Sequence, residues 1–229
     1  MFDIPMDLKS LEKSIIAYEQ EPIEKGKILF YGHSLFTRWG APKWGYRRMD
    51  EDIRMKDGSL AVVNHGFGTS TSEEQLYFYD RMVRPWEPRA LVIATYANDA
   101  MYGYGPDQTI INLSKILHWA RTDFPGIKLF IVEPHPMPSG KDSKLPDKWN
   151  NGVNKRKHFM EMIDIYAQTH DDTEIIRLWN RPEFFETPED VGNFHKVRED
   201  IFVEDRVHPN QAGYDILAKI FREVLDELL

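Results

Sequence analysis

The chain has 229 residues, of which 41% are hydrophobic and 13% aromatic, enough for one domain with a sizeable core. A net charge of −8 without a basic stripe argues against nucleic acid as a partner, because phosphates must be neutralised by lysine and arginine. The absence of cysteine excludes disulfides, thiolate catalysis and cysteine-based zinc sites. The apolar runs are far shorter than the roughly 20 residues that span a bilayer. The first residues lack the cations and apolar segment of a secretory signal, so we expect a cytoplasmic protein without a membrane partner.

Segments of helix and strand character alternate along the chain. Leu8, Leu11 and Ile15 recur at three-to-four spacing, which predicts an N-terminal helix at about residues 8–20. In chain order, the further expected elements are a strand at 27–31, a strand at 60–64, a helix at 71–84, a strand at 90–96, a helix at 107–124, a strand at 128–133, a helix at 154–169, a strand at 173–178 and a helix at 210–229.

This alternation predicts an α/β fold in a single domain over residues 1–229. The continuous apolar run at residues 90–96 is typical of a parallel strand covered on both faces. We therefore expect a three-layer α/β/α architecture around a doubly wound, five-stranded parallel sheet. Two long irregular stretches, residues 33–59 and 134–154, remain as candidate functional loops.

Polar residues follow the expected strands at their carboxyl ends, where such sheets bind ligands. Ser34 follows the first strand, residues 66–70 follow the second, Asn98 the third and His135 the fourth. Far downstream, an Asp-x-x-His motif places Asp205 and His208 on one short turn before the last helix.

Ser34, His208 and Asp205 have the chemistry of a nucleophile with its base. A serine hydroxyl is a poor nucleophile until a base removes its proton, which His208 can do, and Asp205 can fix the tautomer of that histidine. A developing oxyanion needs preorganised donors. The backbone N–H of Ser34, the loop 66–69 and the amide of Asn98 are the candidate donors.

Four blocks in this order resemble the SGNH (GDSL) hydrolase family, whose fold is flavodoxin-like. They are Gly32-His33-Ser34, Asn64-His65-Gly66-Phe67-Gly68-Thr69-Ser70, Asn98-Asp99 and Asp205-Arg206-Val207-His208. The resemblance implies that Ser34 is the nucleophile, that His208 is the general base and then the general acid, and that Asp205 orients it. It places the oxyanion hole at the N–H groups of Ser34 and Thr69, with Gly68 as the alternative, and at Asn98.

The chain departs from the family pattern at three positions. His33 stands where the family usually has aspartate, Thr69 where it has the oxyanion glycine, and Tyr96 where it has another glycine. We expect Tyr96 to narrow the pocket near the oxyanion hole and so to favour a short acyl group such as acetyl. His33, Tyr96, His135 and Trp39 are the candidate substrate-binding residues.

The resemblance thus implies a serine esterase that needs no cofactor and forms an acyl-enzyme on a small-molecule or carbohydrate ester. A lipid or small-ester acylhydrolase is the alternative within this chemistry. A second alternative is a non-catalytic carbohydrate- or ligand-binding protein, and a third is a metal-dependent hydrolase built on the histidines. No His-x-x-x-His spacing supports a metal site. The oligomeric state stays open.

Overall fold

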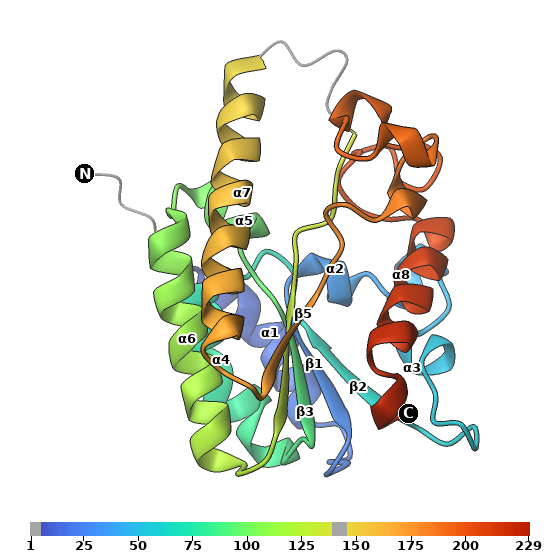
Figure 1. The fold of residues 1–229 in the computed structure, drawn as a ribbon. Helices are drawn as coiled ribbons and strands as arrows, with labels where there is room; N and C mark the ends of the chain where they lie inside the picture. Colours follow the sequence, from blue (N-terminus) through green and yellow to red (C-terminus); the bar gives the residue numbers. More distant parts are fainter. Residues whose placement is uncertain (1–5, 139–145) are drawn as a thin grey trace.

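A five-stranded, wholly parallel sheet forms the centre of the computed structural model, which describes residues 6–138 and 146–229. The spatial order of the strands is β2-β1-β3-β4-β5, as Figure 1 shows. This order confirms the doubly wound α/β fold that the sequence predicts. The strands are β1 (Ile28–Gly32), β2 (Val62–Gly66), β3 (Ala90–Ala94), β4 (Lys128–Val132) and β5 (Thr173–Ile176).

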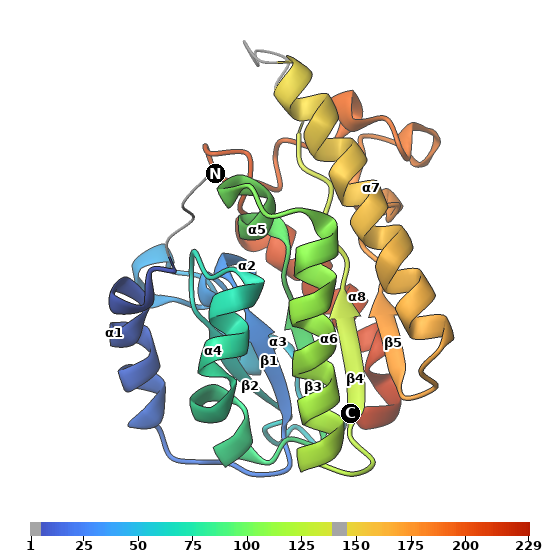
Figure 2. The same cartoon turned by 90° about the vertical axis from the view of Figure 1, so that its left-hand side faces the viewer.

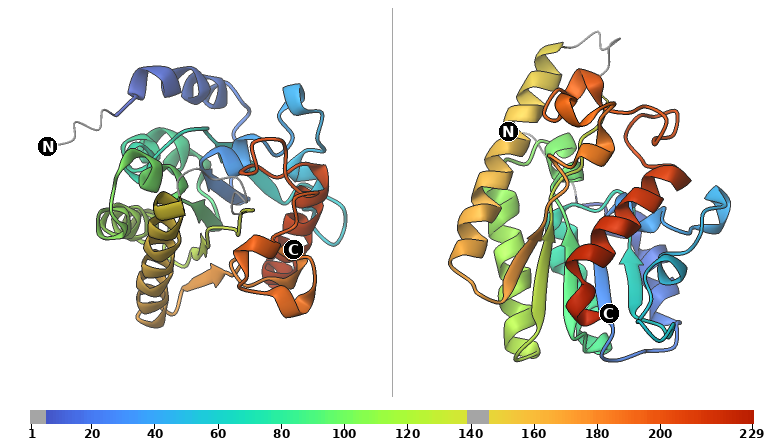
Figure 3. Two further views of the ribbon diagram at one scale, coloured as in Figure 1. Left: turned by 90° about the horizontal axis from the view of Figure 1, so that it is seen from above. Right: turned by 45° about the vertical axis from the view of Figure 1, so that its right-hand side comes forward.

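Helices cover both faces of the sheet, so that the molecule has three layers (Figures 1 and 2). One face carries α1 (Leu8–Glu19), α4 (Ser72–Met82), α6 (Pro106–Asp123) and α7 (Pro146–Gln168). The other carries α2 (Ser34–Thr37), α3 (Met49–Asp52) and α8 (Gln211–Val224), and the right-hand view of Figure 3 shows α8 lying across the strands. The short helix α5 (Ala97–Tyr102) follows β3 at the carboxyl end of the sheet.

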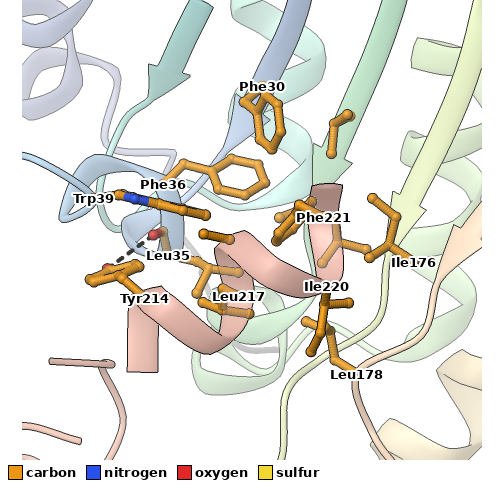
Figure 4. Close-up of a cluster of buried hydrophobic side chains, with 14 of the residues drawn as sticks. Phe30, Leu35, Phe36, Trp39, Ile176, Leu178, Tyr214, Leu217, Ile220 and Phe221 are labelled. Carbon is orange, nitrogen blue, oxygen red and sulfur yellow. Dashed lines mark hydrogen bonds between the residues drawn. The ribbon is translucent and has the colours of Figure 1, made fainter. Parts of the chain in front are cut away.

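Strand β1 supplies side chains to both hydrophobic cores because successive residues of a strand point to opposite faces. Phe30 packs on the side of α8, where its ring lies 5.3 Å from that of Phe221 (Figure 4). Tyr31 packs on the side of α4 and donates a hydrogen bond of 2.5 Å to the carbonyl of Gln75. Two-sided burial explains why the sequence of this strand is continuously apolar.

The observed boundaries differ from the predicted ones mainly at β2 and α7. Strand β2 extends through Asn64 and His65 to Gly66, since both polar side chains find partners: Asn64 bonds to the carbonyl of Phe36 at 2.9 Å and His65 to that of Met82 at 2.7 Å. Helix α7 begins at Pro146, well before residue 154, within the stretch expected to be irregular. The middle of that stretch, residues 139–145, lies outside the described residues.

The connection between β5 and α8 contains three short 3-10 turns that the sequence pattern does not reveal. They cover Pro182–Phe184, Pro188–Asp190 and Phe194–Lys196. The segment after them returns to the carboxyl end of the sheet and brings residues 205–208 next to the end of β1 (Figure 1). Within the described part of the chain, no helix is long and apolar enough to cross a membrane.

Candidate active site

Ser34 lies at the turn where β1 ends and the short helix α2 begins. Gly32 makes this turn possible, because a Cβ atom there would come within 2.6 Å of the carbonyl oxygen of Ala94 in β3. His33 then caps α2: its Nδ1 accepts a hydrogen bond of 3.3 Å from the N–H of Leu35. The serine therefore stands at the carboxyl edge of the sheet, where the sequence places it.

Ser34, His208 and Asp205 form one hydrogen-bonded chain. The Oγ of Ser34 lies 2.9 Å from Nε2 of His208, and Nδ1 of the same ring lies 2.7 Å from Oδ2 of Asp205. With the proton on Nδ1, the ring donates to the carboxylate and its Nε2 accepts from the serine hydroxyl. The structure thus brings together the three residues that the sequence singles out.

The Asp205 carboxylate is held by several donors as well as by the histidine ring. Its Oδ1 accepts 2.9 Å hydrogen bonds from the N–H groups of Val207 and His208, and Arg38 donates to Oδ2 at 3.1 Å. Burial alone would raise the pKa of Asp205, but the two backbone N–H groups and the His208 ring outweigh it and lower that pKa to about 2. Asp205 is therefore a stable anion next to the imidazole.

The pKa of His208 is lowered by partial burial and by the positive charge of Arg38, against the opposing effect of Asp205. Both influences favour the neutral imidazole, which is the form that can accept a proton from Ser34. Arg38 was not among the residues that the sequence singles out for a role. Arg38 follows Ser34 by four residues at the end of α2, and this spacing is the signal that could have placed it near Ser34.

The loop after β2 lies against the serine. A Cβ atom built on Gly68 would be 3.9 Å from the Cβ of Ser34, so the backbone at this point of the loop is next to Ser34. Thr69 has a φ of 69°, a left-handed conformation that glycine adopts without strain, and its side chain is exposed. The Gly-to-Thr departure therefore keeps the backbone shape. The oxyanion roles of Gly68 and Thr69 stay predictions.

Asn98 lies in the first turn of α5, and its side chain is almost completely buried. One N–H of its amide donates to the carbonyl of Ser70 at 2.8 Å, which ties α5 to the loop that follows β2. An amide group has two N–H donors. Within the described part of the chain, the second N–H makes no hydrogen bond, so it is available for the oxyanion role that the sequence predicts for Asn98.

Asp99, which follows Asn98, holds this region together. Its buried carboxylate accepts hydrogen bonds from the N–H and hydroxyl of Ser72, from the hydroxyl of Thr109 at 3.1 Å and from the N–H of Tyr96 at 3.2 Å. Burial raises the pKa of Asp99, and the hydrogen bonds oppose that effect. These contacts place Asp99 between α4, α5 and α6 and give it a structural role.

The N-terminal helix provides a second anchor for the loop that follows β2. Tyr18 of α1 donates a hydrogen bond of 2.6 Å to the carbonyl of Gly66, the last residue of β2. A Cβ on Gly66 would meet the backbone nitrogen of Thr37 at 2.3 Å, so β2 and the serine-bearing helix α2 touch here. Asn64 joins the same contact through its side-chain oxygen, which accepts from the N–H of Gly66 at 3.0 Å.

His33 and His135 lie beside His208 as neutral rings. Burial, together with the charges of His135 and His208, lowers the pKa of His33 to about 3. Burial also lowers the pKa of His135 to about 4, and its Nε2 lies 2.9 Å from the carbonyl of Val207, next to His208. A cavity of about 20 Å³ adjoins the serine turn and is lined by His33, His135 and Arg156, among others. Both histidines thus lie where substrate contact is geometrically possible.

Arg156 also lines this cavity, although the sequence pattern places it on a solvated helix face. A Lys-Arg-Lys run inside an amphipathic helix predicts a solvated face, whereas the Arg156 side chain is half-buried and lines the cavity beside His33. Burial lowers the pKa of its guanidinium. A solvated run and a run with one inward-pointing member look alike until the orientation of the helix is known.

The prediction that Tyr96 narrows the pocket is wrong. Its ring is fully buried in the helix layer, where it stacks on Phe159 of α7 with ring centroids 4.5 Å apart. Tyr96 does not line the cavity at the serine turn. Its φ of 79° is one that glycine adopts without strain. Glycine therefore suits this position because of the backbone conformation and not because of the space in the pocket.

Trp39 is likewise a core residue, and its assignment as a substrate-binding residue is wrong. Only 2% of its surface is exposed, and its Nε1 donates to Asp52 at 2.8 Å. Its ring packs against Tyr214 and Phe221 of α8 (Figure 4). Among the described residues, no group of three or more His, Asp or Glu side chains could hold a metal ion.

The fold and this arrangement at its carboxyl edge are those of an ester-hydrolysing α/β protein. Residues 30–216 match the GDSL-like lipase/acylhydrolase family, and the chain belongs to that family. This confirms the resemblance seen in the sequence. A search of curated proteins found no match.

Solved structures of the same fold cover nearly the whole chain. A GDSL-like lipase from Bacteroides thetaiotaomicron is 18% identical with a TM-score of 0.67, covering 97% of this chain and 98% of its own. A lipase/acylhydrolase from Enterococcus faecalis is 18% identical with a TM-score of 0.65 and coverages of 88% and 96%. An acetyl-xylooligosaccharide esterase variant from Geobacillus Stearmophilus is 16% identical with a TM-score of 0.62 and coverages of 91% and 96%. At these identities, the likeness concerns the fold.

Proposed function

We propose that the protein is a serine esterase that cleaves short-chain carboxylic esters through an acyl-enzyme. The observation that carries this proposal is the hydrogen-bonded chain from Ser34 through His208 to Asp205. A binding protein has no need of a serine aligned on a neutral imidazole with a carboxylate behind it.

In the first half of the reaction, Ser34 Oγ attacks the ester carbonyl while Nε2 of His208 takes the hydroxyl proton. The negative charge that develops on the carbonyl oxygen is stabilised by the N–H of Ser34, by an N–H of the loop at Gly68 and Thr69, and by the amide of Asn98. His208 then returns the proton to the leaving alcohol, and the acyl group stays on the serine.

In the second half, His208 deprotonates a water molecule, which attacks the acyl-enzyme carbonyl. The tetrahedral intermediate collapses, the ester bond to Ser34 breaks, and the histidine gives the proton back to the serine oxygen. The products are a carboxylic acid and the free hydroxyl. Asp205 remains ionised throughout, since its pKa of about 2 lies far below neutral pH.

The small cavity beside the serine turn, which Tyr96 does not line, supports a short acyl group. It holds about 20 Å³ and is lined by Leu35, Ala94, Ala97 and Val132 besides the polar groups. In the same measure, roughly 10–15 Å³ accommodates one water molecule, so this space suits a methyl group better than a longer chain. Acetyl is therefore the proposed acyl group. A carbohydrate is the proposed alcohol, in line with the acetyl-xylooligosaccharide esterase among the structural neighbours.

A series of p-nitrophenyl esters from acetate to octanoate tests this proposal. We expect kcat/KM to be highest for acetate and to fall steeply at butyrate, whereas a rate that rises with chain length would contradict the short-acyl proposal. Val132→Ala should raise the butyrate-to-acetate ratio, because Val132 lines the cavity. Val92→Ala is the matched control, since Val92 is equally buried on the same sheet face but lies away from the cavity.

A further inference from the structure

A second and much larger cavity lies further along the same edge of the sheet. It holds about 670 Å³ and is bounded by α7 on one side and by the segment that follows β5 on the other. Figure 1 shows these two walls rising above the carboxyl ends of the strands, where ligands bind in open α/β sheets. The volume lies within the range of roughly 300–1,000 Å³ that is usual for small-molecule sites. The catalytic chemistry described above makes no use of this space.

The larger cavity adjoins the catalytic site. Glu133, which follows β4 directly, lines both this cavity and the small one beside the serine turn. In the sheet, β4 is two strands away from β1, and β5 is three. At a strand spacing of about 4.8 Å, the cavity therefore begins about 10–14 Å from the nucleophile. An alcohol part of two or three linked rings would be needed to bridge this distance.

The walls of the cavity combine apolar surface with charged side chains, and the charges of these side chains cancel. Arg177 pairs with Glu133 at 2.8 Å and also with Asp164, and Arg181 pairs with Glu223. An anionic ligand would meet these carboxylates, and a bare hydrocarbon chain would take water away from the charged groups without making any hydrogen bond to them. Hydroxyl groups, which both donate and accept, match a surface where guanidinium donors and carboxylate acceptors alternate.

An aromatic surface completes the site. Trp179, the third residue after β5, has its ring 4.6 Å from that of Phe194 and lines the cavity with it. Glu133 fixes the backbone beneath this pair by accepting hydrogen bonds from the N–H groups of Leu178 and Trp179 at 2.9 and 3.0 Å. Such a rigid apolar wall beside paired polar groups suits the mixed surface of a sugar ring.

We propose that this cavity, the β5 subsite, binds the uncharged carbohydrate portion of the ester while the acyl group occupies the small cavity beside the serine turn. The proposal rests on the esterase function argued above and names the part of the substrate that determines its specificity. It assigns specificity to residues after β5 and on α7, which have no contact with the reacting atoms. Efficient substrates then have at least two sugar rings.

Asn180 offers a direct test, because it is exposed at the cavity wall, and Asn180→Trp should fill the space. The substrates are p-nitrophenyl acetate together with acetylated mono- and trisaccharides of xylose, glucose and N-acetylglucosamine. For the unmodified enzyme, we expect kcat/KM for at least one trisaccharide to exceed that of its monosaccharide by about tenfold. Asn180→Trp should remove this advantage, mainly through KM, and leave p-nitrophenyl acetate hydrolysis unchanged.

Glu24→Trp is the matched control, since Glu24 is an exposed residue that lines a hollow of similar size, about 570 Å³, beside β2. It should leave the trisaccharide advantage intact. The proposal is overturned if no trisaccharide exceeds its monosaccharide, if Asn180→Trp leaves the advantage in place, or if it slows all substrates equally. It is also overturned if Asn180→Trp selectively impairs p-nitrophenyl octanoate, which would assign the cavity to an acyl chain. Loss of p-nitrophenyl acetate hydrolysis in Ser34→Ala tests the esterase function separately.

Discussion

Arg38 should set the pH at which the enzyme becomes active. Its guanidinium donates to the Asp205 oxygen that also accepts from His208, so the arginine nitrogen and the imidazole Nδ1 lie no more than about 6 Å apart. Because the imidazole must be neutral to act as a base, activity falls as the pH drops through the pKa of His208. A cation at this distance disfavours the imidazolium and lowers that pKa, so its removal should raise it.

The size of this effect follows from Coulomb's law. Two unit charges about 6 Å apart interact by roughly 0.7 kcal/mol in water and roughly 1.4 kcal/mol at half that dielectric constant. The site is partly open to solvent, since the Asp205 side chain is 40% exposed, so the true value should lie in this range. One pKa unit corresponds to about 1.4 kcal/mol. Arg38→Met should therefore move the acid limb of the pH profile upwards by about 0.5 to 1 pH unit.

The assay is kcat/KM for p-nitrophenyl acetate between pH 4 and 9. Arg38→Met keeps much of the apolar stem but removes the guanidinium, whose central carbon lies 4.5 Å from the centroid of the Trp44 ring. Arg38→Lys retains the charge and should restore most of the original profile. Arg48→Met is the matched control, because Arg48 pairs with Asp50 instead. An acid limb that stays in place or moves to lower pH in Arg38→Met would refute the electrostatic reasoning.

Three further substitutions probe the groups around Ser34. Asp205→Asn should lower kcat by about 10³- to 10⁴-fold, because an amide that donates cannot hold the His208 tautomer, and a loss below tenfold would contradict this role. Tyr18→Phe removes the hydrogen bond to Gly66 and should lower kcat several-fold at similar KM, while an unchanged kcat would show that the bond only stabilises the fold. His135→Phe retains a ring but loses the bond to Val207; we expect about a fivefold loss of kcat, and full activity would exclude a positioning role.

The sequence predicts the layers and the position of Ser34 well because both depend on local patterns. Continuous apolar strands, helix stop signals and residues that follow strand ends are visible in a single chain, and the topology of parallel sheets then brings Ser34 and Asn98 to one edge. The Asp-x-x-His spacing likewise reflects a local turn, in which Asp205 accepts from the N–H of His208.

The errors concern side-chain direction, which depends on how helices pack. Trp39 stands in a loop-rich stretch, but α8 covers it, and Tyr96 points into the layer of α7 because its positive φ turns the chain there. The inward direction of Arg156 likewise depends on how α7 packs, and the charged run that contains this residue does not indicate it. The large cavity after β5 is formed in part by a segment with 3-10 turns. Such turns have no periodic pattern in the sequence, so the sequence does not reveal the cavity.

Covalent labelling of Ser34 tests most directly whether this residue is the nucleophile. The protein is incubated with a fluorophosphonate probe, digested and analysed by peptide mass spectrometry. We expect the label on Ser34, with labelling slowed at least a hundredfold in His208→Ala and absent in Ser34→Ala, in parallel with the loss of p-nitrophenyl acetate hydrolysis. Labelling at another residue, or hydrolysis that persists in Ser34→Ala, would contradict the assignment of Ser34 as the nucleophile.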